Sequence, residues 1–182
     1  MTDFHKALAH VLKSEGGYAN HKNDLGGMTY CGIAYAFWPS WKGWPIVTGL
    51  VDEGNPPKAD NPILAPLVME FYRVNFWDKI RGQQIASQAI ATYLLDSAVL
   101  FGVQRAVRMA QEACNGASPN WINPDGKMGT ATVGAMNVAN PVDLLRLFRQ
   151  IRIDYHKARV AKDPSQAVFL NGWITRANAQ IT

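Results

Sequence analysis

Two residues near the start of the chain, Glu15 and Asp24, carry carboxyl groups at a spacing that suits shared acid–base chemistry. Glu15 lies in the run Ser-Glu-Gly-Gly-Tyr, and Asp24 opens the run Asp-Leu-Gly-Gly-Met-Thr. Glu15 continues the apolar stripe of a predicted helix over residues 3–14, and the two glycines after it are expected to end that helix with positive φ angles. Partial burial and the negative end of the helix dipole both favour the protonated carboxyl. That is the form a general acid needs.

Asp24 is expected to stay ionised, because its polar, glycine-rich surroundings offer water and backbone N–H groups. One protonated and one ionised carboxyl form the pair that hydrolyses glycosidic bonds. Thr29 follows five residues later and could hydrogen-bond an attacking water. The alternatives are structural: Glu15 as an exposed helix end, Asp24 as a turn residue before two glycines, and Thr29 as a helix N-cap.

These motifs resemble glycoside hydrolase family 108, the N-acetylmuramidases found among phage endolysins and bacterial secretion activator proteins. The resemblance runs from about Phe4 to Arg176. Later segments with the family's pattern follow in the same order: 71–78, 102–107, 125–129 and 172–173. The resemblance implies a mainly α, lysozyme-like fold with a small hairpin or loop region after the first helix. It also implies a catalytic half over residues 1–90 and a helical, peptidoglycan-binding half over 91–182.

The implied activity is that of a bacteriolytic lysozyme, which cuts the β-1,4 bond between N-acetylmuramic acid and N-acetylglucosamine. Glu15 matches the family's catalytic glutamate and would protonate the glycosidic oxygen. Asp24, with Thr29, would orient water or stabilise the positive charge on the sugar. Carboxyl groups ~6.5–9.5 Å apart invert the anomeric centre, whereas a gap of ~5–5.5 Å gives retention. Nine residues with an intervening turn favour the wider gap.

Aromatic side chains near these motifs offer faces on which sugar rings can stack. Tyr18 follows the glutamate motif directly, and Trp41 and Trp44 lie at the start of a proline-rich stretch over residues 40–66. A long irregular stretch of this kind often forms one lip of a binding cleft. We interpret Tyr18, Trp41 and Trp44 as candidate substrate-binding residues; for the tryptophans, the alternative is a half-buried place in the core.

Cys31 supports a rival hypothesis, a wall peptidase with a cysteine nucleophile. A helix predicted over residues 32–38 would begin beside it, and a helix N-terminus lowers the pKa of a thiol. Such an enzyme also needs a histidine base, and the distant candidate, His156, lies inside a predicted helix. A third hypothesis is a non-catalytic wall-binding or secretion-assisting protein, against which the intact pair Glu15 and Asp24 argues.

The composition is that of a folded protein, with 48% hydrophobic and 18% charged residues in a chain of 182. A net charge of +4 suits an anionic polymer such as a bacterial wall, and no base-reading motif points to nucleic acid. The two cysteines and four histidines show no metal-binding or redox spacing, so we expect no metal and no cofactor.

We expect neither a membrane span nor a secretion leader. Its longest apolar run, over residues 85–103, is interrupted by polar side chains, and the N-terminus lacks a basic segment followed by an apolar core. We expect a monomer that is made in the cytoplasm without a Sec signal and does not insert stably in membranes. Release by a holin or a specialised secretion route would let it act in the periplasm or on the wall.

Helical periodicity predicts most of the remaining elements. The predicted helices beyond the first span residues 32–38, 65–79, 87–101, 104–115, 141–161 and 165–178. The helix over 87–101 is apolar on nearly all sides, which indicates a central, buried position. Asp96 lies within it and must have a partner. We expect a capping or core hydrogen bond, and the alternative is a role in catalysis. In the helix over 141–161, Arg152 is placed at the edge of the apolar face.

Overall fold

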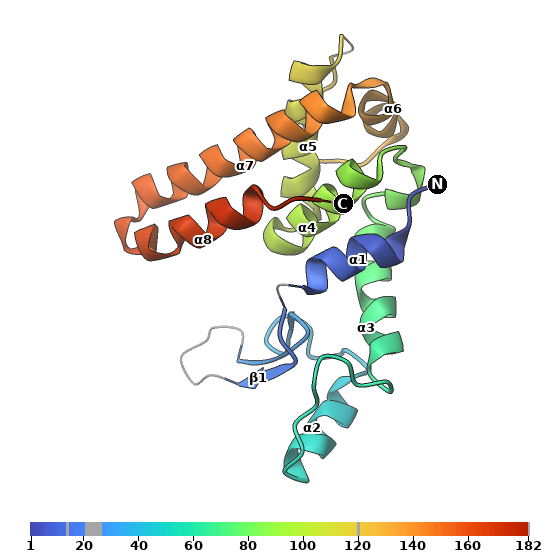
Figure 1. The fold of residues 1–182 in the computed structure, drawn as a ribbon, viewed down its shortest axis with the longest axis vertical. Coiled ribbons are helices and arrows are strands. Elements are labelled where there is room, and N and C mark those ends of the chain that lie inside the picture. Colours follow the sequence, from blue (N-terminus) through green and yellow to red (C-terminus); the bar gives the residue numbers. More distant parts are fainter. Residues whose placement is uncertain (14, 21–26, 120, 182) are drawn as a thin grey trace. The chain divides into compact units, whose positions relative to one another are not determined.

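A computed structural model describes residues 1–13, 15–20, 27–119 and 121–181. Within these ranges the protein is mainly α-helical, with eight α-helices and one small three-stranded sheet, as predicted (Figure 1). The chain divides into two compact units. We call Leu8–Asn75 the sheet unit, and Met1–Ala7 together with Phe76–Thr182 the helical unit. None of the helices described is long and apolar enough to cross a membrane.

Helix α1, Phe4–Leu12, confirms the first predicted helix. Asp3 caps its start, because the backbone N–H of His5 donates to Asp3 Oδ1 at 2.8 Å. Leu8 and Val11 are buried on the apolar face that the sequence predicts. The helix ends at Leu12, three residues before Glu15.

The sheet unit contains an antiparallel meander of β1 (Tyr18–Asn20), β2 (Met28–Tyr30) and β3 (Ile33–Ala34). Cys31 and Gly32 join β2 to β3 with φ angles of 47° and 76°, as in the two-residue type I′ turns of hairpins. The helix predicted over 32–38 is therefore wrong. Tyr30 and Ile33 pair across the turn and are fully buried, so pairing of the apolar residues in a hairpin overrode the helical pattern.

The stretch over residues 40–66 is only partly irregular, because it contains helix α2, Trp44–Asp52. Proline at the first turn starts this helix, since its missing N–H has no helical partner at that position. The irregular remainder binds the hairpin. The N–H of Tyr18 donates to the carbonyl of Pro57 at 3.1 Å, and the Tyr30 hydroxyl donates to the carbonyl of Lys58 at 2.8 Å.

Helix α3, Ala65–Tyr72, buries Val68, Phe71 and Tyr72 and continues as one π-helical turn, Arg73–Trp77. Together the two segments cover most of the helix predicted over residues 65–79. Asn75 marks the end of the sheet unit, and its side-chain amide donates to the carbonyl of Phe71 at 2.9 Å.

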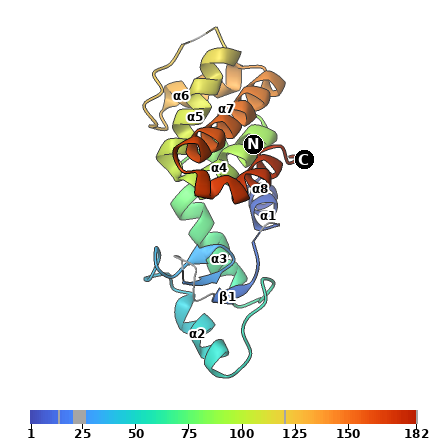
Figure 2. The same ribbon diagram turned by 90° about the vertical axis from the view of Figure 1, so that its left-hand side faces the viewer.

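The helical unit is built around α4, Gln88–Phe101, whose residues Ile90–Ala98 are all buried. This confirms the predicted central helix. Helices α5 (Val103–Ala117) and α7 (Pro141–Lys162) pack on α4 and on each other, and α8 (Ala167–Ala177) runs beside α7 (Figure 1, Figure 2).

Helix α6, Thr130–Val138, has no counterpart among the predicted helices. Its sequence is rich in β-branched residues and contains a glycine, and these residues have low helix propensity. The turn before it is anchored to α5 through Gln111, a buried residue. The Gln111 side chain accepts from the N–H of Gly126 at 2.8 Å and donates to Asp125 Oδ1 at 3.0 Å.

The sequence requires a partner for Asp96, and the structure shows two arginines in this role. Arg152 donates to Asp96 Oδ2 at 2.6 Å, and Arg176 donates to Oδ1 at 2.9 Å. Burial raises the pKa of Asp96, but the two guanidinium groups outweigh it and hold the pKa below its ordinary value. Arg152 is fully buried, so its expected place at the edge of the apolar face is wrong. The buried face of α7 contains Arg152 because Asp96, inside the unit, requires a counter-charge.

Candidate active site

Glu15 lies just beyond the end of α1, where its N–H donates to the carbonyl of Leu12 at 3.0 Å. Its carboxyl group lies against the turn between β2 and β3. A β-carbon added at Gly32 would come 2.8 Å from Glu15 Oε2 and 3.0 Å from Cδ. Gly32 is thus required twice, for its positive φ and for the close approach of this carboxyl group.

Tyr72 brings α3 to the same turn. Its hydroxyl would lie 2.8 Å from the added β-carbon at Gly32 and donates to the carbonyl of Cys31 at 2.7 Å. The Tyr72 ring is buried, whereas Glu15 is half-buried and Gly32 is exposed. The Glu15 carboxyl group therefore lies beside the Gly32 backbone and the Tyr72 hydroxyl, at a place that solvent can reach, which suits a proton donor.

The glycines after Glu15 do not act as the sequence suggested, because neither is among the described glycines with positive φ. Gly17 is needed for space instead. A β-carbon there would come 2.8 Å from the backbone nitrogen of Ala59 and 3.0 Å from the carbonyl oxygen of Pro57. The carbonyl of Gly17 also accepts from the N–H of Cys31 at 3.4 Å. The glycine run thus lets the hairpin dock on the segment 57–59.

Thr29 and Tyr18 lie on opposite faces of the hairpin. Tyr18 pairs with Tyr30 and Ala19 pairs with Thr29, and neighbouring residues in a strand point to alternate faces. Both side chains are half-buried. Thr29 lies within β2, so it caps no helix, and its hydroxyl is 3.5 Å from the carbonyl of Ala19, at the limit of a hydrogen bond. Asp24, the second carboxyl of the predicted pair, lies outside the described residues.

Trp41 and Trp44 are core residues, 9% and 3% exposed. Their rings meet edge-to-face at 5.1 Å, and Trp41 stacks on Tyr30 at 6.0 Å. The indole N–H of Trp44 donates to the carbonyl of Trp38 at 2.7 Å. Of the two, Trp41 lines a pocket of about 240 Å³. Trp44 has almost no exposed surface, and Trp41 exposes only a small part of its ring, so both are core residues and we revise the expectation that they bind substrate.

Tyr72 is the residue of this site that sequence reasoning missed. It stands inside a run that the family resemblance includes, but no spacing rule marks it. Its hydrogen-bond partner, Cys31, is 41 residues away in the chain. Nothing in the spacing of the two residues indicates that Tyr72 and Cys31 are in contact.

Cys31 has the surroundings of a structural thiol. It is 2% exposed, its Sγ lies 3.8 Å from the carbonyl oxygen of Ala59, and no helix begins beside it. Burial raises the pKa of the Cys31 thiol, and the nearby Glu15 adds to that effect. A nucleophilic cysteine needs a lowered pKa, so these features argue against the peptidase hypothesis. In the ranges described, no group of three or more His, Cys, Asp or Glu side chains is placed to hold a metal ion.

Comparisons with known proteins give family matches for both parts of the chain. The family described as glycosyl hydrolase 108 matches residues 8–102, and a "Predicted Peptidoglycan domain" matches residues 105–178. A comparison with curated proteins finds no match. Among solved structures, SagA of Brucella abortus is 26% identical, with a TM-score of 0.68 over 96% of this chain and 88% of that one.

The two matches meet between residues 102 and 105, after the end of helix α4. The division between residues 90 and 91 that we expected from the sequence would instead cut this buried helix. The first match contains Glu15, Gly32 and Tyr72, and the second contains α5 to α8. A glycosyl hydrolase domain followed by a peptidoglycan domain makes this protein a glycoside hydrolase of peptidoglycan. The first match covers more than half of the chain, which therefore belongs to glycosyl hydrolase family 108.

Proposed function

We propose that this protein is a lysozyme that cleaves the β-1,4 bond between N-acetylmuramic acid and N-acetylglucosamine, with Glu15 as the general acid. One observation supports the assignment above all others. The Glu15 carboxyl is held against the Gly32 backbone, beside the Tyr72 hydroxyl, yet remains half-exposed. A proton donor needs both a fixed position and access to the glycosidic oxygen.

Asp24 and Thr29 complete the proposed mechanism. As the glycosidic bond breaks, positive charge develops on the sugar, and the Asp24 carboxylate would stabilise it or orient the attacking water. Among the described residues the Thr29 hydroxyl makes only a weak contact, with the carbonyl of Ala19, and it is available to hold that water. We propose an inverting reaction, in which the water occupies a gap of ~6.5–9.5 Å between the two carboxyl groups. Tyr18 is the proposed aromatic contact for a sugar ring.

The test is digestion of purified peptidoglycan, with mass analysis of the soluble fragments. A muramidase releases fragments with new reducing-end muramic acid and no new free amino groups. Glu15→Gln keeps the shape of the side chain but cannot donate the acidic proton, so turnover should fall by ~10²–10⁴-fold. Glu53→Gln is the matched control, because Glu53 is an exposed residue at the end of α2 and should keep the parental rate.

Two results would contradict the proposal. A folded Glu15→Gln protein that digests peptidoglycan at the parental rate would remove Glu15 from the mechanism. Fragments with new amino groups and intact glycan chains would support the Cys31 peptidase instead. Cys31→Ser separates the two hypotheses directly, because a muramidase should keep most of its activity after this change, with any loss following stability.

We also propose a monomeric enzyme that reaches the wall from the cytoplasm through a holin or a specialised secretion route, as an endolysin or a secretion-assisting muramidase would. The net charge of +4 supports action on an anionic polymer. Expression with and without a co-expressed holin, followed by cell lysis, tests the route.

A further inference from the structure

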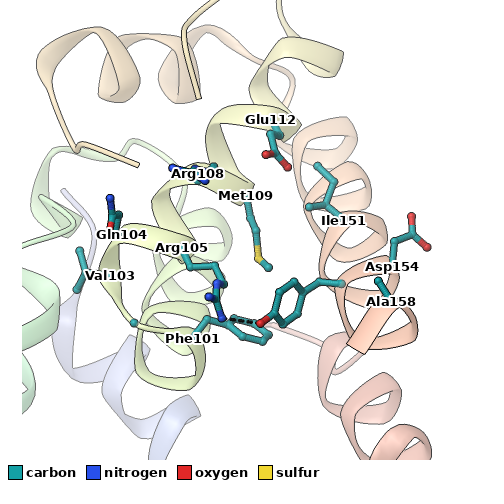
Figure 3. Close-up of a pocket in the computed structure, with 12 residues that line it drawn as sticks. Phe101, Val103, Gln104, Arg105, Arg108, Met109, Glu112, Ile151, Asp154 and Ala158 are labelled. Carbon is teal, nitrogen blue, oxygen red and sulfur yellow. Dashed lines mark hydrogen bonds between the residues drawn. The ribbon is translucent and has the colours of Figure 1, made fainter. Parts of the chain in front are cut away.

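A second site lies in the helical unit, in a pocket of about 860 Å³ between α5 and α7 (Figure 3). This volume is within the range of sites that bind small molecules and short peptides. None of the residues proposed for catalysis lines it. We call it the α5–α7 pocket, and its chemistry differs from that of the Glu15 site because it presents charges of both signs.

The positive charges come from α5. Arg105 donates a hydrogen bond to the Tyr155 hydroxyl, and its guanidinium group lies 5.0 Å from the centre of the Tyr155 ring (Figure 3). These contacts fix its direction. Arg108 is exposed and makes no side-chain hydrogen bond or ion pair with the residues that the structure describes. A guanidinium group without a protein partner is available to bind a carboxylate in two-pronged geometry.

The negative charges lie on both walls. Glu112 stands one turn after Arg108 on α5, yet it too makes no side-chain hydrogen bond or ion pair within the described part of the chain. Asp154 faces the pocket from α7 and accepts a hydrogen bond from Gln150 at 2.8 Å. Met109 and Ile151 provide apolar surface between the charged groups (Figure 3).

This lining matches a ligand that has carboxylates, a free amine and short apolar side chains within a few residues. In peptidoglycan the peptide stems have that chemistry. The N-acetylated sugars of the glycan strand have no free amine, and the lactyl carboxyl groups of the strand are amide-bonded to the stems. We propose that the α5–α7 pocket binds the stem peptide of peptidoglycan, with Arg105 and Arg108 on its carboxylates and Glu112 on its free amine. The proposal rests on peptidoglycan as the substrate and names the part of it that the helical unit holds.

A peptide site would give the enzyme a second hold on the polymer that it cuts. Two weak sites on one chain raise the overall affinity for a repetitive polymer far above that of either site alone. Activity on intact peptidoglycan should then depend on the α5–α7 pocket. Activity on glycan strands from which an amidase has removed the peptides should not.

The binding test uses the full-length Glu15→Gln protein, which cannot digest its ligand, and the tetrapeptide that an amidase releases from peptidoglycan. Calorimetric titration should show binding that weakens as salt is added, because the contacts are between exposed charges. Arg108→Gln and Glu112→Gln should each weaken binding by roughly 2- to 5-fold, the effect expected from removing one contact between exposed charges. The matched control is Arg146→Gln, which removes the same charge from α7 outside the pocket and should bind as the parent does.

The activity test repeats the pocket substitutions with Glu15 intact. Arg108→Gln should raise KM on intact peptidoglycan and leave kcat, and all activity on peptide-free glycan, unchanged. Absence of tetrapeptide binding, or equal binding by parent, Arg108→Gln and Glu112→Gln proteins with unchanged unfolding midpoints, would overturn the proposal. So would tight binding of peptide-free glycan that these substitutions weaken. Failure of the muramidase assignment looks different, because the wild-type protein would then release no reducing-end muramic acid at all.

Discussion

The hydroxyl of Tyr72 donates a 2.7 Å hydrogen bond to the carbonyl of Cys31, and this bond ties α3 to the turn that supports Glu15. Both residues are buried, so the carbonyl has little access to water as a substitute. We therefore expect Tyr72 to position the Glu15 carboxyl group. Loss of this hydrogen bond should affect both the stability of the sheet unit and the direction of that carboxyl group.

Tyr72→Phe should lower the free energy of unfolding by about 1–3 kcal/mol, the cost of leaving a buried carbonyl without its donor. It should also lower kcat by roughly 10- to 100-fold, since small displacements of a catalytic group have effects of this size. KM should not change. Urea unfolding and steady-state kinetics measure these effects. The control is Tyr35→Phe, at an exposed tyrosine, and equal behaviour of the two variants would contradict a positioning role.

Gly32→Ala should abolish most activity, because the new methyl group would come 2.8 Å from both Glu15 Oε2 and the Tyr72 hydroxyl. The backbone conformation alone should cost about 1 kcal/mol of stability. Gly54→Ala separates the two effects, because Gly54 has a similar φ of 75° with open space around its α-carbon. Both variants should lose comparable stability from φ strain, but only Gly32→Ala should lose activity beyond its unfolded fraction. Retained activity in Gly32→Ala would show that the carboxyl group does not need this surface.

Asp96→Asn should destabilise the helical unit by about 3–5 kcal/mol, because it leaves the fully buried Arg152 without a full counter-charge. Asp143→Asn is the control, since Asp143 pairs with Arg146 at 3.7 Å on the surface and such pairs contribute less than about 1 kcal/mol. Thermal or urea unfolding distinguishes them. A small effect of Asp96→Asn would indicate that the new amide oxygen and the Ser97 hydroxyl satisfy Arg152 without the charge on Asp96.

Acid should destabilise the helical unit through His156. Burial, together with the charges of Arg152 and Arg159, lowers the pKa of His156 from 6.5 to about 4. Between these pH values His156 binds a proton in the unfolded chain but not in the folded protein. The free energy of unfolding should therefore fall as the pH is lowered from about 6.5 to about 4. The loss should be on the order of 3 kcal/mol at most. The ring stacks on Trp173 at 4.8 Å, and neither of its nitrogens has a hydrogen-bond partner among the described residues.

His156→Phe tests this prediction, because it keeps an aromatic ring in the stack but cannot bind a proton. Urea midpoints measured at several pH values should change less with pH in this variant than in the parent. His5→Gln alters an exposed histidine and should leave the pH dependence almost unchanged. An unchanged pH dependence in His156→Phe would assign the acid sensitivity to other groups, such as Asp96.

The long helices were predictable from the sequence because their apolar residues recur with helical period. Helices α4, α5, α7 and α8 all begin and end within a few residues of their predicted limits. The elements that were missed lack this signal. Helix α6 is short and contains glycine and β-branched residues, and the β2–β3 hairpin pairs only two residues per strand. Such short segments take their structure from what they pack against.

The sequence by itself determined the family resemblance, the mainly α-helical fold and the choice of Glu15 as the candidate acid. Each of these depends on residues close together in the chain. The tertiary structure decided which groups surround Glu15, that Trp41 and Trp44 belong to the core, and that α7 turns Arg152 inward. Asp96 and Arg152 are 56 residues apart, and Cys31 and Tyr72 are 41 apart. Contacts between residues so far apart in the chain form only when whole helices and strands pack together. Packing buries a charge or a carbonyl group, and the buried group then needs a partner from another element.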